Sequence, residues 1–129
     1  MRLHKLRLAV LALALLLAGA SQALAGIAGV YEVKGKNPSG QAYEGRATVK
    51  SDQGVYHVVW KIGKSRHVGT GLLKDDQFSV VYKSAQRKDQ RPGLVVYEMQ
   101  DDGSMVGVYV GLGSNDMGRE QWRPAGRTQ

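Results

Sequence analysis

The histidines and the paired aspartates are the residues of this chain that could perform acid–base or metal chemistry. His57 and His67 flank one predicted turn, and two acidic pairs, at residues 75–76 and 101–102, lie at others. A hydrolytic triad needs a nucleophile, a base and an orienting group in contact, and no Gly-x-Ser-x-Gly segment accompanies these histidines. Neither acidic pair has the ligand spacing of a calcium loop. The sequence therefore predicts structural histidines and solvated turn aspartates, with no metal site, no cofactor and no enzymatic activity.

A cationic segment between two predicted strands is the sharpest charge feature. Its four cations are Lys83, Arg87, Lys88 and Arg91, with a single acid among them. Charge-assisted hydrogen bonds from such a loop could hold a phosphate, a carboxylate or a sulfated polysaccharide. The segment has no interleaved aromatic residues for stacking on bases, so no nucleic-acid partner is expected. The sequence predicts an anionic macromolecule as the partner of this basic loop, with a plain solvated loop as the alternative.

Aromatic residues recur on the predicted strands and could form a second kind of site. Tyr and Trp combine an apolar body with a polar tip, which suits the wall of a ligand cavity. The candidates for such a wall are Tyr43, Tyr56, Trp60, Tyr82, Tyr97, Tyr109 and Trp122. Core packing explains the same residues more simply. The sequence leaves open whether the interior is filled or holds a small ligand.

Strands must position these residues, because apolar and polar residues alternate with period two from Gly29 onward. No window after residue 26 has the spacing of an amphipathic helix. Turn signals separate the alternating segments, and among them Asp-Gly at 102–103 is a favoured hairpin pair. We expect strands near residues 29–35, 41–50, 54–62, 66–73, 77–83, 93–99, 104–110 and 117–123.

Short strands joined by tight turns predict an all-β antiparallel meander. Closing the sheet removes its exposed edges, so we expect an about eight-stranded up-and-down barrel of the calycin or avidin type. The interior of such a barrel is just filled by side chains or holds one small ligand. An open two-sheet sandwich is the alternative. Outward residues such as Glu44, Arg46 and Lys50 are too polar to face lipid, which argues against a membrane-spanning barrel.

The first 25 residues have the layout of a secretory signal peptide. A basic start is followed by an apolar segment at 8–17, and Ala23 and Ala25 form a small-x-small cleavage site. The apolar segment is shorter than the roughly 20 residues that span a bilayer, so a membrane anchor is the weaker alternative. We expect cleavage after Ala25, a single domain over residues 26–129, a periplasmic or secreted location and no membrane span after signal removal.

Charge and cysteine content narrow the choice of partner. The chain has no cysteine, which excludes a disulfide framework and thiol chemistry. Removing the three basic residues of the signal leaves 15 Lys and Arg against 11 acids in the remaining 104 residues, a net charge of +4. This mild excess favours an anionic partner or surface.

Glycines and aromatic residues recur at fixed spacings through nearly the whole domain. The segments that show this are Gly29-x-Tyr31-x-Val33-x-Gly35, Tyr56-x-Val58-x-Trp60-x-Ile62-Gly63, Gly93-Leu94-Val95-x-Tyr97 and Gly118-x-Glu120-x-x-x-Pro124. The pattern resembles a family of small exported bacterial β-proteins, some of them labelled fibronectin-binding protein. The resemblance implies a β-barrel and a fibronectin-type matrix ligand, and it brings no catalytic or ligand residues. This chain lacks the cysteines that such proteins often carry, and the Trp they carry where Val108-Tyr109 stands here.

Two functions follow as hypotheses. The first is a non-enzymatic exported binding protein of the bacterial envelope or cell surface, which contacts an anionic or extracellular-matrix macromolecule through the basic loop. The alternative is a small-ligand carrier with an aromatic-lined interior, and a cavity of about 300 Å³ or more ringed by Tyr and Trp would favour it. The biotin-contacting set of avidin-like barrels cannot be mapped onto this chain. Periplasmic lysozyme inhibitors are also small barrels, but their basic target would be repelled by a protein of charge +4.

Overall fold

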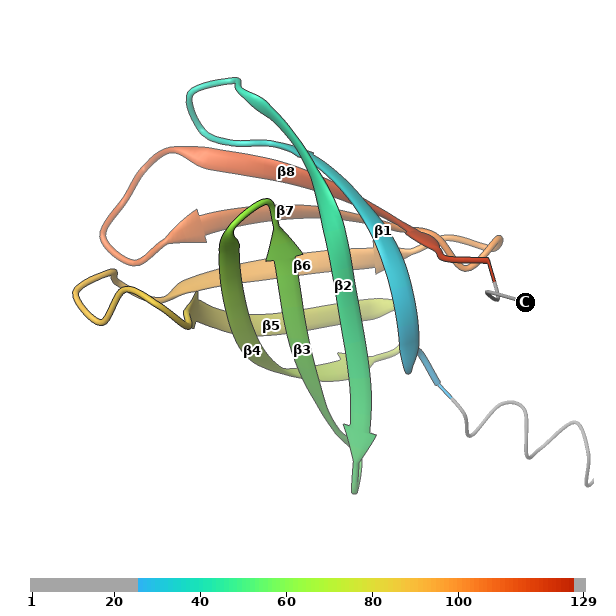
Figure 1. Ribbon diagram of the computed structural model, residues 1–129. Coiled ribbons are helices and arrows are strands. Elements are labelled where there is room, and N and C mark those ends of the chain that lie inside the picture. The colour runs from blue at the N-terminus through green and yellow to red at the C-terminus, as the bar shows by residue number, and fades with distance from the viewer. Residues whose placement is uncertain (1–25, 127–129) are drawn as a thin grey trace, which may run out of the picture.

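A closed barrel of eight antiparallel strands is the architecture of the computed structural model, which describes residues 26–126 (Figure 1). The strands are β1 (Gly29–Lys36), β2 (Ala42–Asp52), β3 (Val55–Ile62), β4 (Ser65–Lys74), β5 (Gln77–Ser84), β6 (Gly93–Met99), β7 (Met105–Gly111) and β8 (Met117–Pro124). Each lies within two residues of its predicted position, and the predicted all-β barrel is confirmed. The expected signal peptide lies outside the described residues.

Pairing between the first and last strands closes the barrel and excludes the open sandwich. β1 pairs with β2 on one side, and with β8 from Tyr31 opposite Pro124 to Lys36 opposite Arg119 on the other. All other neighbours are consecutive in the sequence, so the chain runs up and down around the barrel and leaves no exposed sheet edge. Residues 26–126 contain no helix that is long and apolar enough to cross a membrane.

Tight turns carry the meander from strand to strand. Between β2 and β3, Gln53 and Gly54 have φ values of 50° and 83°, and a two-residue hairpin needs positive φ at both of these positions. The connections after β2, β4 and β6 lie at one end of the barrel. The connections after β1, β3, β5 and β7 lie at the other end, so every second connection meets at the same rim.

The core follows from the period-two alternation, because every second side chain points inward. Trp122 is at its centre: its ring centroid lies 4.4 Å from that of Tyr97 and 5.1 Å from that of Tyr31. Ile27, which precedes β1, is also buried, and its carbonyl accepts a 2.7 Å hydrogen bond from the Tyr31 hydroxyl. The buried cluster comprises Ile27, Tyr31, Val33, Ala47, Val49, Val58, Trp60, Phe78, Val80, Val95, Tyr97, Met105 and Trp122.

Inward-facing glycines lie opposite several of the tyrosines on the neighbouring strand. The directly paired residues are Gly35 with Tyr43, Gly93 with Tyr82, Gly107 with Tyr97 and Gly118 with Tyr109. A Cβ atom at any of these glycines would overlap the ring of its partner. Each ring therefore lies across a glycine and along the barrel wall, instead of crossing the interior.

The outer surface has two different halves, which corrects the expectation of polar outward faces. On β1 and β2 that expectation holds, with Lys34 and Glu44 forming an exposed ion pair of 3.8 Å. On β6 and β7 it is wrong, because the outward side chains of Leu94, Val106 and Val108 are apolar and exposed. On β4 and β5 exposed apolar residues, Leu72 and Val81, lie among polar ones. Several of these strands carry apolar residues on both faces, so their alternation does not identify which face meets water.

Candidate functional site

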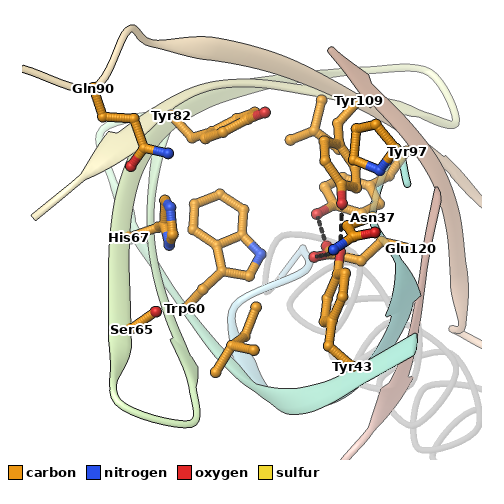
Figure 2. A pocket seen from close by; sticks show the side chains of 13 residues that line it. Asn37, Tyr43, Trp60, Ser65, His67, Tyr82, Gln90, Tyr97, Tyr109 and Glu120 are labelled. Carbon is orange, nitrogen blue, oxygen red and sulfur yellow. Dashed lines mark hydrogen bonds between the residues drawn. The ribbon is translucent and has the colours of Figure 1, made fainter. Parts of the chain in front are cut away.

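A cavity of about 430 Å³ opens at the end of the barrel where the connections after β1, β3, β5 and β7 meet (Figure 2). This volume falls within the range of small-molecule sites, which is about 300–1,000 Å³. The residues that line it are Asn37, Pro38, Tyr43, Trp60, Ile62, Ser65, His67, Tyr82, Gln90, Val95, Tyr97, Tyr109 and Glu120. Strand residues form its wall and floor, and connecting segments form its rim.

Aromatic rings form most of the wall. Trp60 of β3 and Tyr82 of β5 meet edge to face, with ring centroids 6.1 Å apart, and Tyr82 meets Tyr109 of β7 in the same way at 6.2 Å. Edge-to-face pairs of this kind are favourable because the positive edge of one ring approaches the negative face of the other. Figure 2 shows Trp60 and Tyr82 on one side of the opening, with Tyr43, Tyr97 and Tyr109 on the other. The wall is therefore formed by contacts within the protein itself.

The floor carries a buried carboxylate, that of Glu120 on β8, whose residue is only 7% exposed. Its Oε1 accepts a hydrogen bond from the Tyr43 hydroxyl at 2.8 Å. Its Oε2 accepts two, from the Tyr97 hydroxyl at 2.5 Å and from the Trp122 indole N–H at 2.9 Å. These donors replace the water that the carboxylate loses on burial, which would otherwise make its burial costly.

No cation compensates this charge inside the described part of the barrel. The one ion pair among residues 26–126 is that of Lys34 and Glu44 on the outer surface. The hydroxyls of Tyr43 and Tyr109 lie 3.2 Å apart, and the single proton of Tyr43 points to the carboxylate because that is the stronger acceptor. The Glu120 carboxyl group is thus surrounded by neutral hydrogen-bond donors, with no cation beside it.

The phenols around Glu120 hold their protons firmly. Burial is the main cause and the negative charge of Glu120 the next, and together they raise the pKa values of Tyr43 and Tyr97. Burial also raises the pKa of Tyr82 to about 12, with smaller contributions from Tyr109 and Glu120. At neutral pH these groups are hydrogen-bond donors, and they offer no nucleophile or base.

The two histidines occupy opposite faces of the barrel wall. His57 is exposed on the outer face, as its register predicts, with its Nδ1 3.5 Å from the Thr70 hydroxyl. His67 lines the cavity, and its ring lies edge to face with Tyr82 at 6.2 Å. Burial lowers the pKa of His67, against a smaller opposing effect of Glu120. The His67 ring is therefore a neutral part of the wall at pH 7.

The predicted aromatic set divides into two groups. Five of its members line the cavity: Tyr43, Trp60, Tyr82, Tyr97 and Tyr109. The other two do not. Trp122 is fully buried below the cavity, and Tyr56 packs edge to face on Phe78 with centroids 5.6 Å apart.

The basic loop lies at the rim of the same cavity. Arg87, Lys88 and Arg91 are exposed in the connection between β5 and β6, whereas Lys83 is exposed on the outer face of β5. Gln86 ties this connection to the β3–β4 turn, because its amide donates to the Lys64 carbonyl at 2.9 Å. Gln90 of the same connection lines the cavity. The two sites that the sequence offered as alternatives therefore share one end of the molecule.

Glu120 is the central residue that sequence reasoning missed as a site. The available signal was its position on β8, where it shares the inward register of Gly118 and Trp122. A charged residue in the inward register of a strand is unusual, because burying a charge without hydrogen bonds is very costly. That position alone marks it as a candidate site residue.

The polar groups of the cavity include phenol hydroxyls, side-chain amides, a histidine and one carboxylate. Within residues 26–126, no group of three or more His, Asp and Glu side chains is placed to hold a metal ion. A hollow aromatic wall with one carboxylate on its floor can accept a donor group and enclose an apolar body. Neither a protein-family model nor a curated protein matches this chain in sequence, so the family resemblance of its glycine and aromatic pattern stays a prediction.

Proposed function

We propose that this protein is a non-enzymatic binding protein that holds a small ligand in the cavity at the open end of its barrel. The observation that carries the proposal is the cavity of about 430 Å³ with walls of Trp60, Tyr82 and Tyr109. It exceeds the roughly 300 Å³ at which an aromatic-lined barrel interior favours a carrier.

The construction of the wall supports the same function. Rings that lie against inward-facing glycines, such as Tyr82 on Gly93 and Tyr109 on Gly118, are held to the wall by the backbone itself. When a ligand enters a cavity with fixed walls, little binding free energy is lost in ordering the protein, because its side chains lose little freedom on binding. Among the polar groups that line the cavity, the hydroxyls of Tyr43 and Tyr97 are fixed by their hydrogen bonds to Glu120.

A second candidate site is the basic loop at the rim. Arg87, Lys88 and Arg91 are exposed beside the mouth, and none of them forms an ion pair within residues 26–126. We propose it as the contact for an anionic or extracellular-matrix macromolecule, in a protein that acts after export to the envelope or cell surface. The leader-like first 25 residues support the export.

The carrier proposal is tested by titrating the purified protein with benzyl alcohol and following its tryptophan fluorescence, to which Trp60 in the cavity wall contributes. Binding should saturate. Tyr82→Ala should weaken it at least about twofold to tenfold, because an aromatic contact contributes about 0.5–1.5 kcal/mol beyond area burial.

The matched control is Val81→Ala on the same strand, since Val81 points outward and is exposed. It should leave the affinity unchanged. Equal affinities for the wild-type protein and Tyr82→Ala would contradict the proposed site, and a linear, unsaturable response would contradict the proposed function.

A further inference from the structure

The floor of the cavity has one hydrogen-bond position that the protein leaves unfilled. A carboxylate offers about four acceptor positions, two on each oxygen. Tyr97 and Trp122 occupy both positions of Oε2, whereas Tyr43 alone donates to Oε1. Because Glu120 lines the cavity, the remaining position of Oε1 is available to a donor group on a ligand.

The charge of Glu120 also lacks a partner. Its residue is more than nine-tenths buried, and within residues 26–126 no Lys or Arg forms an ion pair with it. The nearby His67 does not supply a positive charge at neutral pH, because burial lowers its pKa. A buried charge interacts strongly with an incoming opposite charge, since the surrounding dielectric constant is low. A cation in the cavity would complete the pair.

The aromatic wall favours the same sign of charge. The faces of Trp and Tyr rings carry negative electrostatic potential, and cations bind over them. Trp60, Tyr82 and Tyr109 surround the space above the Glu120 carboxylate (Figure 2). An anion in this space would meet both the ring faces and a carboxylate, so the interior discriminates against it.

The cations of the basic loop lie outside this environment. Arg87 and Lys88 are exposed at the rim, where water and salt screen charges over about 8 Å at physiological ionic strength. They affect how a charged molecule approaches the mouth. The floor and wall of the cavity determine which class of ligand binds inside it.

We infer that the cavity selects small protonated amines, with Glu120 as their counter-ion and the Trp and Tyr rings as their cage. The inference rests on the proposed function, because it names the ligand class of that same cavity. The ammonium group donates to Oε1 of Glu120, and an apolar body of the ligand packs on Trp60 and Tyr82 toward the mouth.

Three probes of nearly equal size and different charge test the inference: benzylamine in its protonated form, benzyl alcohol and benzoate. At pH 7 the wild-type protein should bind benzylamine at least about tenfold more tightly than benzyl alcohol, since a hydrogen bond to a charged group and a cation–ring contact each add to affinity. Benzoate should bind most weakly. Glu120→Gln keeps the size of the side chain and removes its charge, so it should abolish the preference for benzylamine.

The matched control is Glu98→Gln, which removes the same charge from an exposed position on the outer face of β6 and should leave the preference intact. If Glu120→Gln does not fold, as judged by circular dichroism, the affinities of the wild-type protein for the three probes still test the inference.

The outcomes separate the inference from the function it rests on. Saturable binding of benzylamine and benzyl alcohol with equal affinity would overturn the amine preference and leave the carrier function standing. Tightest binding of benzoate would overturn it in favour of anion binding at the rim. If Glu120→Gln still preferred benzylamine, Glu120 would not be the counter-ion of the amine. No saturable binding of any probe would overturn both proposals.

Discussion

The two ends of the barrel obey the same alternation of inward and outward residues, yet one end is filled and the other is hollow. At the end where the described chain begins, Ile27 and Tyr31 close the interior over the buried Trp122. At the opposite end, Tyr82 and Tyr109 lie against glycines along the wall and leave about 430 Å³ between them. Aromatic content alone does not decide whether a barrel is filled, because the residue opposite each ring determines where the ring lies.

From this difference we expect the two ends to contribute differently to stability and to ligand binding. Side chains at the filled end are fully buried and make many contacts, so they should contribute most of the stability. At the hollow end Tyr43, Tyr82 and Tyr109 are only partly buried, so they should contribute less to stability and more to binding. Substitutions at the two ends test that division.

The largest effect is expected at the filled end. Trp122→Ala should lower the free energy of unfolding by about 3–5 kcal/mol, because it leaves a large cavity in a packed core. Tyr82→Ala, at the hollow end, should cost only about 1–2 kcal/mol because its ring is half exposed. Urea unfolding of both variants gives the comparison. Equal losses would show that the hollow end is as important for stability as the filled end.

The hydrogen bonds to Glu120 should give the next effect. Tyr97→Phe removes a donor to the buried carboxylate and should lower stability by about 1–3 kcal/mol, the usual cost of a hydrogen bond to a charged group. Tyr109→Phe is the matched control, because its hydroxyl reaches Tyr43 at 3.2 Å and not the carboxylate. A loss in Tyr109→Phe as large as that in Tyr97→Phe would contradict the central role of Glu120.

Much of the fold could be predicted from the sequence, because strand position and facing are local properties. The alternation around Trp60 and the turn pair Gln53-Gly54 each depend on a few neighbouring residues. The connections after odd-numbered strands must share one end of an up-and-down barrel, so the meeting of basic loop and cavity rim was implicit in the predicted strand order.

The hollow interior and the role of Glu120 could not be predicted in the same way. The donors to its carboxylate come from Tyr97 and Tyr43, which are 23 and 77 residues away in the sequence. Whether the interior is filled depends on the summed volume of side chains from all eight strands. Neither property is visible in a short window of residues.

Alkaline pH should destabilise the protein through the phenols of the hollow end and floor. An unfolded tyrosine loses its proton near its ordinary pKa of 10.0, whereas burial raises the pKa of Tyr82 to about 12. Between these values the folded state binds more protons, so stability present below about pH 10 is lost as the pH rises. Urea midpoints at about pH 9 and about pH 11 measure this loss, and Tyr82→Phe should reduce it. An identical loss in the variant would contradict the assignment.

Acid pH should also destabilise the protein, in this case through His67. Burial lowers its pKa from the ordinary 6.5, so the unfolded state binds the proton first as the pH falls. The stability contribution is therefore present above about pH 6.5 and is lost below it. His67→Gln should flatten this dependence between about pH 7.5 and about pH 5.5, whereas the outward His57→Gln should not. The reverse result would place the pH sensitivity outside the cavity.

The smallest stability effect is expected at the basic loop. Changing Arg87, Lys88 and Arg91 together to Ser should alter stability by about 0.5 kcal/mol or less, because exposed loop residues make few contacts. This triple variant should elute from a heparin column at a lower salt concentration than the wild-type protein, since fewer exposed charges face the polyanion. The control changes the exposed cations Lys50, Lys74 and Arg123 near the opposite end to Ser. Equal shifts in the elution salt of both triple variants would indicate attraction to the net charge of the protein instead of binding at the basic loop.

The hydrogen bond from the Ala125 amide to the Val30 carbonyl, at 2.9 Å, has a practical consequence for handling this molecule. It brings the two ends of the described chain together at the filled end, and Figure 1 shows them on the side away from the β5–β6 and β7–β8 connections. A tag, a fluorophore or a sensor surface attached at either terminus would leave the mouth of the cavity facing solution. A short peptide joining residues 126 and 26 would give a circular permutant, and new termini in the turns after β2 or β4 would lie away from the residues that line the cavity.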